Sequence, residues 1–555
     1  MILKKVMKKL PGLLALLGMT IFVFLGVISC LSTRRMYTGS ESLYWKWDHV
    51  LGKLLFGGVL IMLWLLIGKA ESWLTDRRMF LAAILVSCMV TVFCIALTWG
   101  ARSEPDADQW YVYVAAEGLF RKDYTNLQNY VYYMVFPHQL GLAKLYATIA
   151  WTVGSISYEI LRFVQAFCAG FSVFFLFLIT RERFKSVRAE CICLLCCGAF
   201  VPLALYTQFL YGESIGVSMV LGSIWFYLLG NRQDLGRRHV RGCSEITCED
   251  LAGSSVPNSN FGNCKSQVIS AQFLRILYWG LAIIAFGIAY LLRPALVVAW
   301  IAMALIQAAW CLRNKKLLPM LGIVLMLTAG VGGQKAVLGN VGKTAGVVVD
   351  NAIPLAFLST AMGMQDYDPF GYGAGSYNGY GWNTFAETGW DQEESVRRAL
   401  QDMKRTLYQW IHHPSVMCTH IFEKVLNQWT EPAYGAFTMT CKMEDPDGWV
   451  EDLYYNDLHE FVYALLDCIQ TFCYFSLAAW FWHLFGAGRR GRETAPQDYL
   501  IGLILIGEFF FSILWEAKSR YVFPYMVIII PCAVGSFSCF CHRMTTLLRQ
   551  RLQWF

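Results

Sequence analysis

The sequence predicts an all-α polytopic membrane protein, a bundle of about 12 transmembrane helices with long loops on one face. The chain of 555 residues is 56% hydrophobic and only 15% charged, whereas a soluble domain carries about 25% charged residues. Its apolar residues come in runs of about 20, the length that crosses a hydrocarbon layer of roughly 30 Å. We find no alternating strands typical of a membrane barrel, so the embedded part is expected to be helical.

The expected helices follow one another along the chain. The first covers 10–31, and we interpret it as retained because its apolar stretch is too long for a signal peptide. A short helix near 138–153 is not expected to cross the bilayer. The other spans are expected at 51–68, 79–99, 156–180, 189–206, 214–230, 274–292, 294–312, 318–338, 459–485, 499–516 and 521–541.

Basic residues test this order, because the positive-inside rule places them in cytoplasmic loops. The clusters fall in alternate loops on the side of the N-terminal lysines, at 77–78, 181–188, 232–241, 313–316 and 489–492. Arg34 and Arg35, after the first helix, are an exception. We therefore expect a multi-pass protein of the cell membrane with both termini in the cytoplasm.

Three regions follow from this topology. Residues 1–338 form an N-terminal transmembrane bundle with a catalytic outer loop at 100–155. Residues 339–458 form an outer region of loops and amphipathic helices, and residues 459–555 supply the C-terminal transmembrane helices. Loops of this length in a compact protein are usually functional.

Two stretches of the outer region have recognisable patterns. In 393–427 apolar residues recur at helical spacing, and Pro414 divides the pattern into two helices. The stretch 365–383 interleaves glycine with tyrosine, so it is either an unstructured surface loop or a mobile loop over the functional site. A separate Ser-, Asn- and Gly-rich insert on the cytoplasmic side, near 231–272, is expected to be a flexible loop.

Charge and cysteine content exclude some functions. The net charge of +7 does not indicate nucleic-acid binding, because the basic residues lie in short loops where they set topology. Most of the 19 cysteines fall in apolar runs, where cysteine acts as a small hydrophobe. Cys243 and Cys248 lack zinc-site partners, and we find no metal site. Cys418 and Cys441 lie outside, where they form a pair or Cys418 is buried on a helix face.

Candidate catalytic residues come first in the loop after the third helix. Asp106 and Asp108 stand there at the outer surface. They are either a solvated helix cap or a general base held at the membrane face. Further along, His138 and Gln139 begin the short helix, where a lone histidine is more often structural than catalytic.

Further charged residues lie at outer helix junctions. Glu213 begins a helix, a position that favours an anion, and Arg293 is either a snorkelling anchor or a phosphate ligand. Glu516, Lys518 and Arg520 lie between the last two helices. Topology would place such cations inside, yet these are outside, so we predict that Lys518 and Arg520 bind an anion. Together these residues suit a lipid-linked phosphosugar, with cations on the phosphate and a carboxylate on the acceptor proton.

Five short motifs carry a resemblance to a known family. They are Asp-Gln-Trp-Tyr-Val, Phe-Pro-His-Gln-Leu-Gly-Leu, Leu-Tyr-Gly-Glu-Ser, Leu-Arg-Pro-Ala and Trp-Glu-Ala-Lys-Ser-Arg-Tyr, spread over about 108–525. Their order resembles the GT-C superfamily of membrane glycosyltransferases, above all its bacterial mannosyltransferase-like or glycosyltransferase family 39-like group. The pair of helices that precedes the Asp loop departs from the usual family pattern.

The resemblance implies residue roles. Asp108 would be the catalytic base, with Asp106 as the competing choice. Arg520, with Lys518 and Arg293, would bind the donor phosphate. The residues expected to contact the substrates are His138, Gln139, Glu213 and Glu516.

These roles predict a hexosyltransferase-type enzyme. It would transfer a sugar, with inversion, from a polyprenyl-phosphate donor to a hydroxyl of a glycan, polymer or lipid acceptor in the cell envelope, without a cofactor and in contact with membrane lipids. The alternative is a transporter or flippase of lipid-linked sugars, which predicts charges at mid-membrane depth. The sequence shows few such charges, since Glu190 and Lys144 lie close to predicted helix ends.

Overall fold

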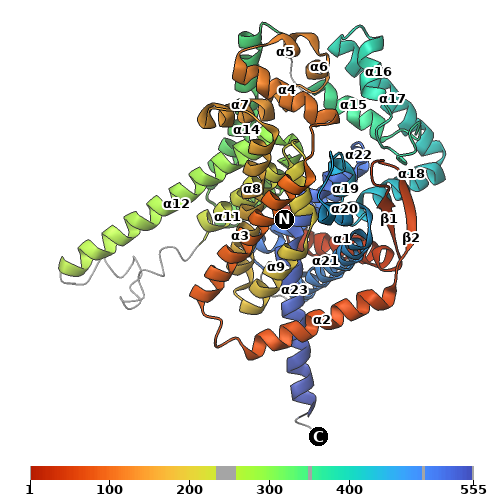
Figure 1. The fold of residues 1–555 in the computed structure, drawn as a ribbon. Helices are drawn as coiled ribbons and strands as arrows, with labels where there is room; N and C mark the ends of the chain where they lie inside the picture. Colours follow the sequence, from red (N-terminus) through yellow and green to blue (C-terminus); the bar gives the residue numbers. More distant parts are fainter. Residues whose placement is uncertain (1, 233–257, 348–352, 491–493, 553–555) are drawn as a thin grey trace.

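The computed structural model describes residues 2–232, 258–347, 353–490 and 494–552. It is a helical bundle with short helices gathered at the top of Figure 1 and the C-terminus at the bottom. Among the described residues, 11 helices are long and apolar enough to cross a membrane, or 12 if one bent pair counts as a span. The predicted all-α polytopic membrane protein is thus confirmed.

The spanning helices match the predicted positions to within a few residues at most ends. They are α1 (Ile2–Leu31), α2 (Val50–Lys69), α3 (Asp76–Ala101), α8 (Tyr158–Phe184), α9 (Val187–Ala199), α11 (Glu213–Gly230), α12 (Asn258–Leu292), α13 (Val297–Asn314), α14 (Pro319–Ala345), α21 (Asp457–Arg489), α22 (Leu500–Leu514) and α23 (Ser519–Leu552). The apolar stretch of α23 is 89% buried and that of α2 only 17%. Helix α23 therefore runs through the bundle, while α2 faces lipid along most of its length.

One predicted span is not a straight helix. Helix α9 ends at Ala199, and the chain continues through α10 (Pro202–Leu205) and the 3₁₀ turn η1 (Tyr206–Gln208) at a bend of 55°. Pro202 explains the break, because proline lacks the N–H that would continue the helix and its ring displaces the preceding turn. The single continuous helix predicted at 189–206 is therefore wrong in shape.

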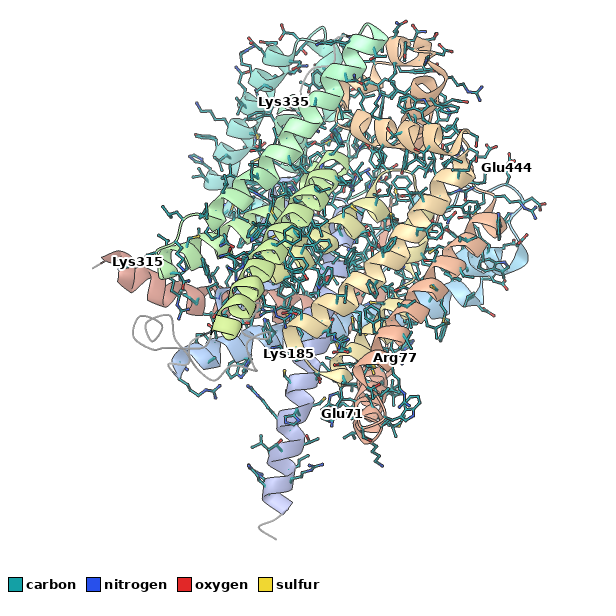
Figure 2. All side chains as sticks on the ribbon, turned by 90° about the vertical axis from the view of Figure 1, so that its left-hand side faces the viewer. Glu71, Arg77, Lys185, Lys315, Lys335 and Glu444 are labelled. Atoms are coloured by element: carbon teal, nitrogen blue, oxygen red, sulfur yellow. The ribbon has the colours of Figure 1, made fainter. Side chains whose placement is uncertain are left out.

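Ion pairs join the loops on one face of the bundle. Arg181 pairs with Asp76 at 2.5 Å, and Arg188 pairs with Glu71 at 2.8 Å. In Figure 2, Glu71, Arg77, Lys185 and Lys315 mark this basic face, and Glu444 lies on the opposite side, the loop face. The basic clusters thus gather on one side, as the predicted topology requires.

A β-hairpin follows the first helix and was not predicted. Strand β1 (Ser32–Met36) pairs antiparallel with β2 (Leu43–Trp47). Arg34 on β1 forms an ion pair with Glu423, and Arg35 pairs with Glu460 at 2.8 Å. Both arginines therefore have carboxylate partners on the loop face, which explains their exception to the positive-inside rule.

Short helices cover the loop face. The predicted short helix at 138–153 and the two helices on either side of Pro414 are confirmed. The first loop folds into α4 (Ala107–Arg121), α5 (Thr125–Asn129), α6 (Tyr132–Val135) and α7 (Gln139–Val153). The later segment folds into α15 (Ile353–Gly363), α16 (Tyr380–Glu387), α17 (Gln392–His412), α18 (Pro414–Trp429), α19 (Ala436–Thr440) and α20 (Gly448–Tyr455). Two further 3₁₀ turns, η4 (Pro294–Leu296) and η5 (Pro496–Tyr499), precede α13 and α22.

Two smaller expectations need correction. Most of the insert predicted as a flexible loop near 231–272 lies outside the described residues, but the part from Asn258 onward belongs to α12. Cys418 and Cys441 are both free, and Cys418 is exposed. They form no disulfide, and Cys418 is not buried on a helix face.

Candidate active site

Two neighbouring carboxylates at the start of α4 have different surroundings. Asp106 is the N-cap residue and pairs with Lys442 at 2.9 Å, in an exposed contact. Asp108 is half-buried, and among the described residues it accepts no hydrogen bond and forms no ion pair. Ala107 between them has φ +48°, a left-handed conformation that costs a non-glycine residue about 1–3 kcal/mol and often marks functional sites. The chain thus presents Asp108 as an unpaired carboxylate.

Aromatic side chains surround Asp108. Burial raises the pKa of the Tyr211 hydroxyl, and the nearby Asp108 carboxylate raises it further. Tyr211 hydrogen-bonds to the Tyr132 hydroxyl at 3.2 Å. The Tyr132 ring in turn stacks on Tyr111, with 4.2 Å between centroids. These rings form an aromatic wall beside the carboxylate, of the kind that packs against the apolar faces of a ligand.

A buried cation lies close enough to interact with Asp108 electrostatically. Arg520 is in the first turn of α23, and its guanidinium lies over the rings of Phe209 and Tyr211 at 5.3 and 5.0 Å. The Nε of Arg520 has no hydrogen-bond acceptor among the described residues. The negative charge of Asp108 interacts favourably with this guanidinium. A buried N–H without a hydrogen-bond acceptor calls for an explanation, and an anionic ligand would supply the acceptor.

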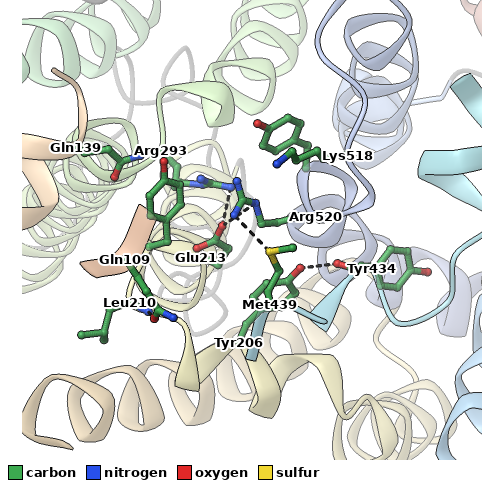
Figure 3. A network of polar contacts seen from close by, with 12 residues as sticks. Gln109, Gln139, Tyr206, Leu210, Glu213, Arg293, Tyr434, Met439, Lys518 and Arg520 are labelled. Carbon is green, nitrogen blue, oxygen red and sulfur yellow. Dashed lines mark hydrogen bonds and ion pairs between the residues drawn. The ribbon is translucent and has the colours of Figure 1, made fainter. Parts of the chain in front are cut away.

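Glu213 holds two arginines together. It is fully buried at the start of α11 and lies 2.8 Å from Arg293 and 3.8 Å from Nε of Arg520. Figure 3 shows its carboxylate facing both guanidinium groups. Gly212, with φ +91°, turns the chain into α11. Because Glu213 is enclosed, its contacts are to the arginines.

Lys518 forms a second charged group beside the arginines. It lies 3.1 Å from Glu41 of the hairpin turn and 3.8 Å from Glu516. Burial opposes its charge, but Glu41 and Glu516 hold the pKa of Lys518 above its usual range. Burial raises the pKa of Glu516, and Lys518 opposes that rise. Sequence reasoning missed Glu41, since one glutamate in a serine-rich turn gives no signal.

His138 and Gln139 lie at the start of α7 near Arg293. Burial, and then the charge of Arg293, lowers the pKa of His138 to about 4, so the ring is neutral at physiological pH. Gln139 donates to Nε2 of His138 at 3.0 Å, which leaves the proton on Nδ1. That Nδ1 and the Gln139 Oε1 have no partner among the described residues. Both are available to hydrogen-bond a ligand.

A narrow pocket opens beside Lys518 and Arg520. Its walls come from the hairpin, from the loop after α15 and from the end of α18. Asn427 Oδ1 and Gln428 Oε1 are buried there without a partner among the described residues. The sequence did not single out these amides, because only the folded chain brings them to the site. Unpaired amide oxygens suit a ligand with hydroxyl groups.

The Gly- and Tyr-rich stretch at 365–383 lies against the site. Gly371, Gly373 and Gly375 all have positive φ, which glycine adopts without strain. The carbonyl of Gly375 accepts a hydrogen bond from the Ala517 N–H at 2.8 Å, and Lys518 lies 5.5 Å from the centre of the Tyr377 ring. The position over the site agrees with the prediction, and the mobility stays a prediction.

The candidate site gathers most of the residues predicted from the sequence. Asp108, Arg293, Arg520 and Lys518, together with His138, Gln139, Glu213 and Glu516, lie on the loop face, and Asp106 lies at its edge. No group of three or more His, Cys, Asp or Glu side chains that could hold a metal ion occurs among the described residues. Cys243 and Cys248 lie outside those residues.

Comparison with known proteins finds a distant structural neighbour. No family model matches the sequence, and no curated protein matches it. The fold is similar to the archaeal oligosaccharyltransferase AglB from Archaeoglobus fulgidus, solved with an inhibitory peptide and a dolichol-phosphate, at a TM-score of 0.38 and 13% identity. The match covers 87% of this chain and 52% of AglB, so the chain spans about half of AglB's length. A likeness this distant identifies neither the family nor the activity of this chain.

Proposed function

We propose that the chain is a membrane glycosyltransferase that moves a sugar from a polyprenyl-phosphate donor to an acceptor hydroxyl at the loop face. The observation that carries the proposal is the placement of Asp108. It is an unpaired, half-buried carboxylate within electrostatic reach of a buried arginine whose Nε lacks an acceptor. A base facing a phosphate-binding cation is what transfer from a phosphate leaving group requires.

The cations would bind the donor phosphate. Arg520 Nε and the Lys518 ammonium would donate to its oxygens, each charge-assisted contact contributing roughly 1.5–3 kcal/mol. Arg293 adds positive charge from the far side of Glu213. Glu213 and Glu41 hold these side chains in place through ion pairs. As the sugar–phosphate bond breaks, the cations stabilise the negative charge that develops on the leaving phosphate.

Asp108 would act on the acceptor. Its carboxylate accepts the proton of the acceptor hydroxyl as that oxygen attacks the anomeric carbon. The bond between the anomeric carbon and the phosphate oxygen breaks on the opposite side of the sugar, so the configuration of the anomeric carbon inverts. This step needs the base and the phosphate on opposite faces of the sugar ring.

Neutral polar groups would recognise the sugar. His138 Nδ1, Gln139 Oε1, Asn427 Oδ1 and Gln428 Oε1 are buried without partners among the described residues, and sugar hydroxyls both donate and accept hydrogen bonds. Glu516 is hydrogen-bonded to the Tyr521 hydroxyl at 3.1 Å and adds an acceptor near Lys518. The loop-face helices between 339 and 458 would select the acceptor, and the loop face would be the outer face of the cell membrane.

Charged side chains buried in the spanning helices favour the rival function of a lipid-linked sugar transporter. Glu508 is fully buried within the span that contains α22, and Asp467 is buried within α21, where it pairs at 2.8 Å with Lys53 at the start of α2. Glu190 lies in the first turn of α9, near a helix end as expected, and it is buried. Charges within spans often mark transport pathways, and the fold buries more of them than the sequence led us to expect.

Donor consumption separates the two functions. Purified protein in vesicles is incubated with a panel of polyprenyl-phosphate hexoses, and the release of free polyprenyl phosphate is measured by chromatography. A glycosyltransferase consumes a donor in the presence of an acceptor extract. Movement of intact donor across the bilayer, without consumption of any panel member, would instead establish the transporter and overturn our proposal.

A further inference from the structure

A groove opens on the membrane side of the bundle, between α1, α21 and α23. Its cavity volume is about 360 Å³, near the lower end of the range of small-molecule sites. Val23, Phe475, Trp482 and Phe540 line it, and each is more than a third exposed. Figure 1 shows these three helices well below α4, which lies near the top. The groove is therefore separate from the candidate active site.

One end of the groove carries positive charge. Arg543 lines it and donates a hydrogen bond to Nδ1 of His483 at 2.7 Å. This contact positions the guanidinium at the mouth, and no acidic side chain is among the described residues that line the groove. The site thus joins an apolar channel to a cation without a carboxylate to neutralise it.

The depth of Arg543 matches a lipid headgroup. It follows Ser519, at the loop-face end of α23, by a length of helix that rises about 36 Å. The hydrocarbon layer is roughly 30 Å thick, so Arg543 lies at the interface of the basic face. Trp482, 63% exposed near the same end of the groove, is of the residue type that gathers at membrane interfaces. Basic pockets between spanning helices on this side suit anionic lipid headgroups.

We propose that this groove binds one anionic glycerophospholipid from the leaflet at the basic face. The lipid phosphate contacts Arg543, and one acyl chain fills the apolar channel toward Val23 and Phe475. The charged end of the groove lies toward the face opposite Asp108, so a lipid phosphate held there is not a donor phosphate in position for transfer. The inference does not rest on the proposed glycosyltransferase activity.

The test measures lipid binding to the purified full chain. Delipidated protein in detergent is titrated with phosphatidylglycerol or phosphatidylcholine of identical acyl chains, followed by native mass spectrometry and thermal unfolding. We expect one phosphatidylglycerol to bind at least tenfold more tightly than phosphatidylcholine. Arg543→Gln should abolish the preference. The matched control Arg549→Gln, on the same helix beyond the groove, should keep it.

A second variant probes the apolar channel. Ala479→Phe places a ring in the groove, since Ala479 lines it, and should weaken the binding of both lipids while the preference for the anionic one persists. Equal affinity of the native protein for both lipids would overturn the inference. So would a preference that survives in Arg543→Gln, or displacement of phosphatidylglycerol by a lower concentration of polyprenyl phosphate.

Discussion

Replacement of Asp108 by asparagine separates catalysis from folding. The change keeps the side-chain size and removes the base, so turnover should fall by about 10²–10⁴-fold, the usual contribution of a general base. That loss corresponds to roughly 2.7–5.4 kcal/mol of transition-state stabilisation. Since Asp108 has no hydrogen bond or ion pair among the described residues, the free energy of unfolding should change by less than about 0.5 kcal/mol.

The assay compares two variants two residues apart. Turnover is measured as release of polyprenyl phosphate from the donor that the native protein consumes, and stability as the midpoint of thermal unfolding. Asp106→Asn is the matched control, because it removes a carboxylate of the same loop whose partner is the exposed Lys442. It should leave turnover within about twofold, since exposed ion pairs contribute little.

The outcome that refutes this reasoning is equally specific. Full turnover in Asp108→Asn, together with an inactive Asp106→Asn, would transfer the catalytic role to Asp106. Equal loss in both variants with a matching fall in the unfolding midpoint would show that the loop was disturbed and that neither carboxylate had been tested as a base.

Four further predictions follow from the site. Arg520→Ala should weaken donor binding about tenfold to a hundredfold, the value of one charge-assisted contact, and unchanged affinity in a binding titration would leave Arg520 as a structural residue. Gly373→Ala should slow turnover, because φ at this position is +95° and the added Cβ would lie 2.2 Å from Asn427. Bound donor should slow the hydrogen exchange of residues 365–383 in the native chain, and should slow it less in the variant. Exchange of 339–458 for the segment of a relative with another acceptor should change acceptor choice but not donor, and retention of the original acceptor in a product analysis would place that choice elsewhere. Burial lowers the pKa of His138 to about 4 in the folded chain, against about 6.5 in the unfolded chain. As the pH falls, His138 is therefore protonated first in the unfolded chain, and stability should fall between about pH 6.5 and pH 4. The fall in the unfolding midpoint over this range should be smaller in His138→Asn.

The spans could be predicted because the bilayer imposes one rule. A helix that crosses it needs a continuous apolar run, and that run is visible without tertiary contacts. The failures lie where local sequence gives way to packing. The β-hairpin depends on pairs such as Arg35 with Glu460, which are far apart in the chain. The bend at Pro202 was readable from proline itself, yet a hydropathy window averages across it.

The site was predicted in part for a similar reason. Charges at helix junctions on the same face converge, so Glu213, Arg293 and Arg520 could be grouped from topology alone. Glu41, Asn427 and Gln428 could not, because the hairpin and the end of α18 reach the site only through the fold. The environment that distinguishes Asp108 from Asp106 also comes from a distant contact, that of Asp106 with Lys442.

The hairpin makes the N-terminal helix pair part of the functional core. Glu41 at its turn is a counter-ion of Lys518, and Lys53 at the start of α2 bonds to Asp467. A chain shortened to begin at α3 would leave Lys518 with Glu516 alone and Asp467 without its cation. The two N-terminal helices therefore support the candidate site through these ion pairs. A chain shortened to begin at α3 should regain the function of the full chain when α1, the hairpin and α2 are supplied as a separate polypeptide.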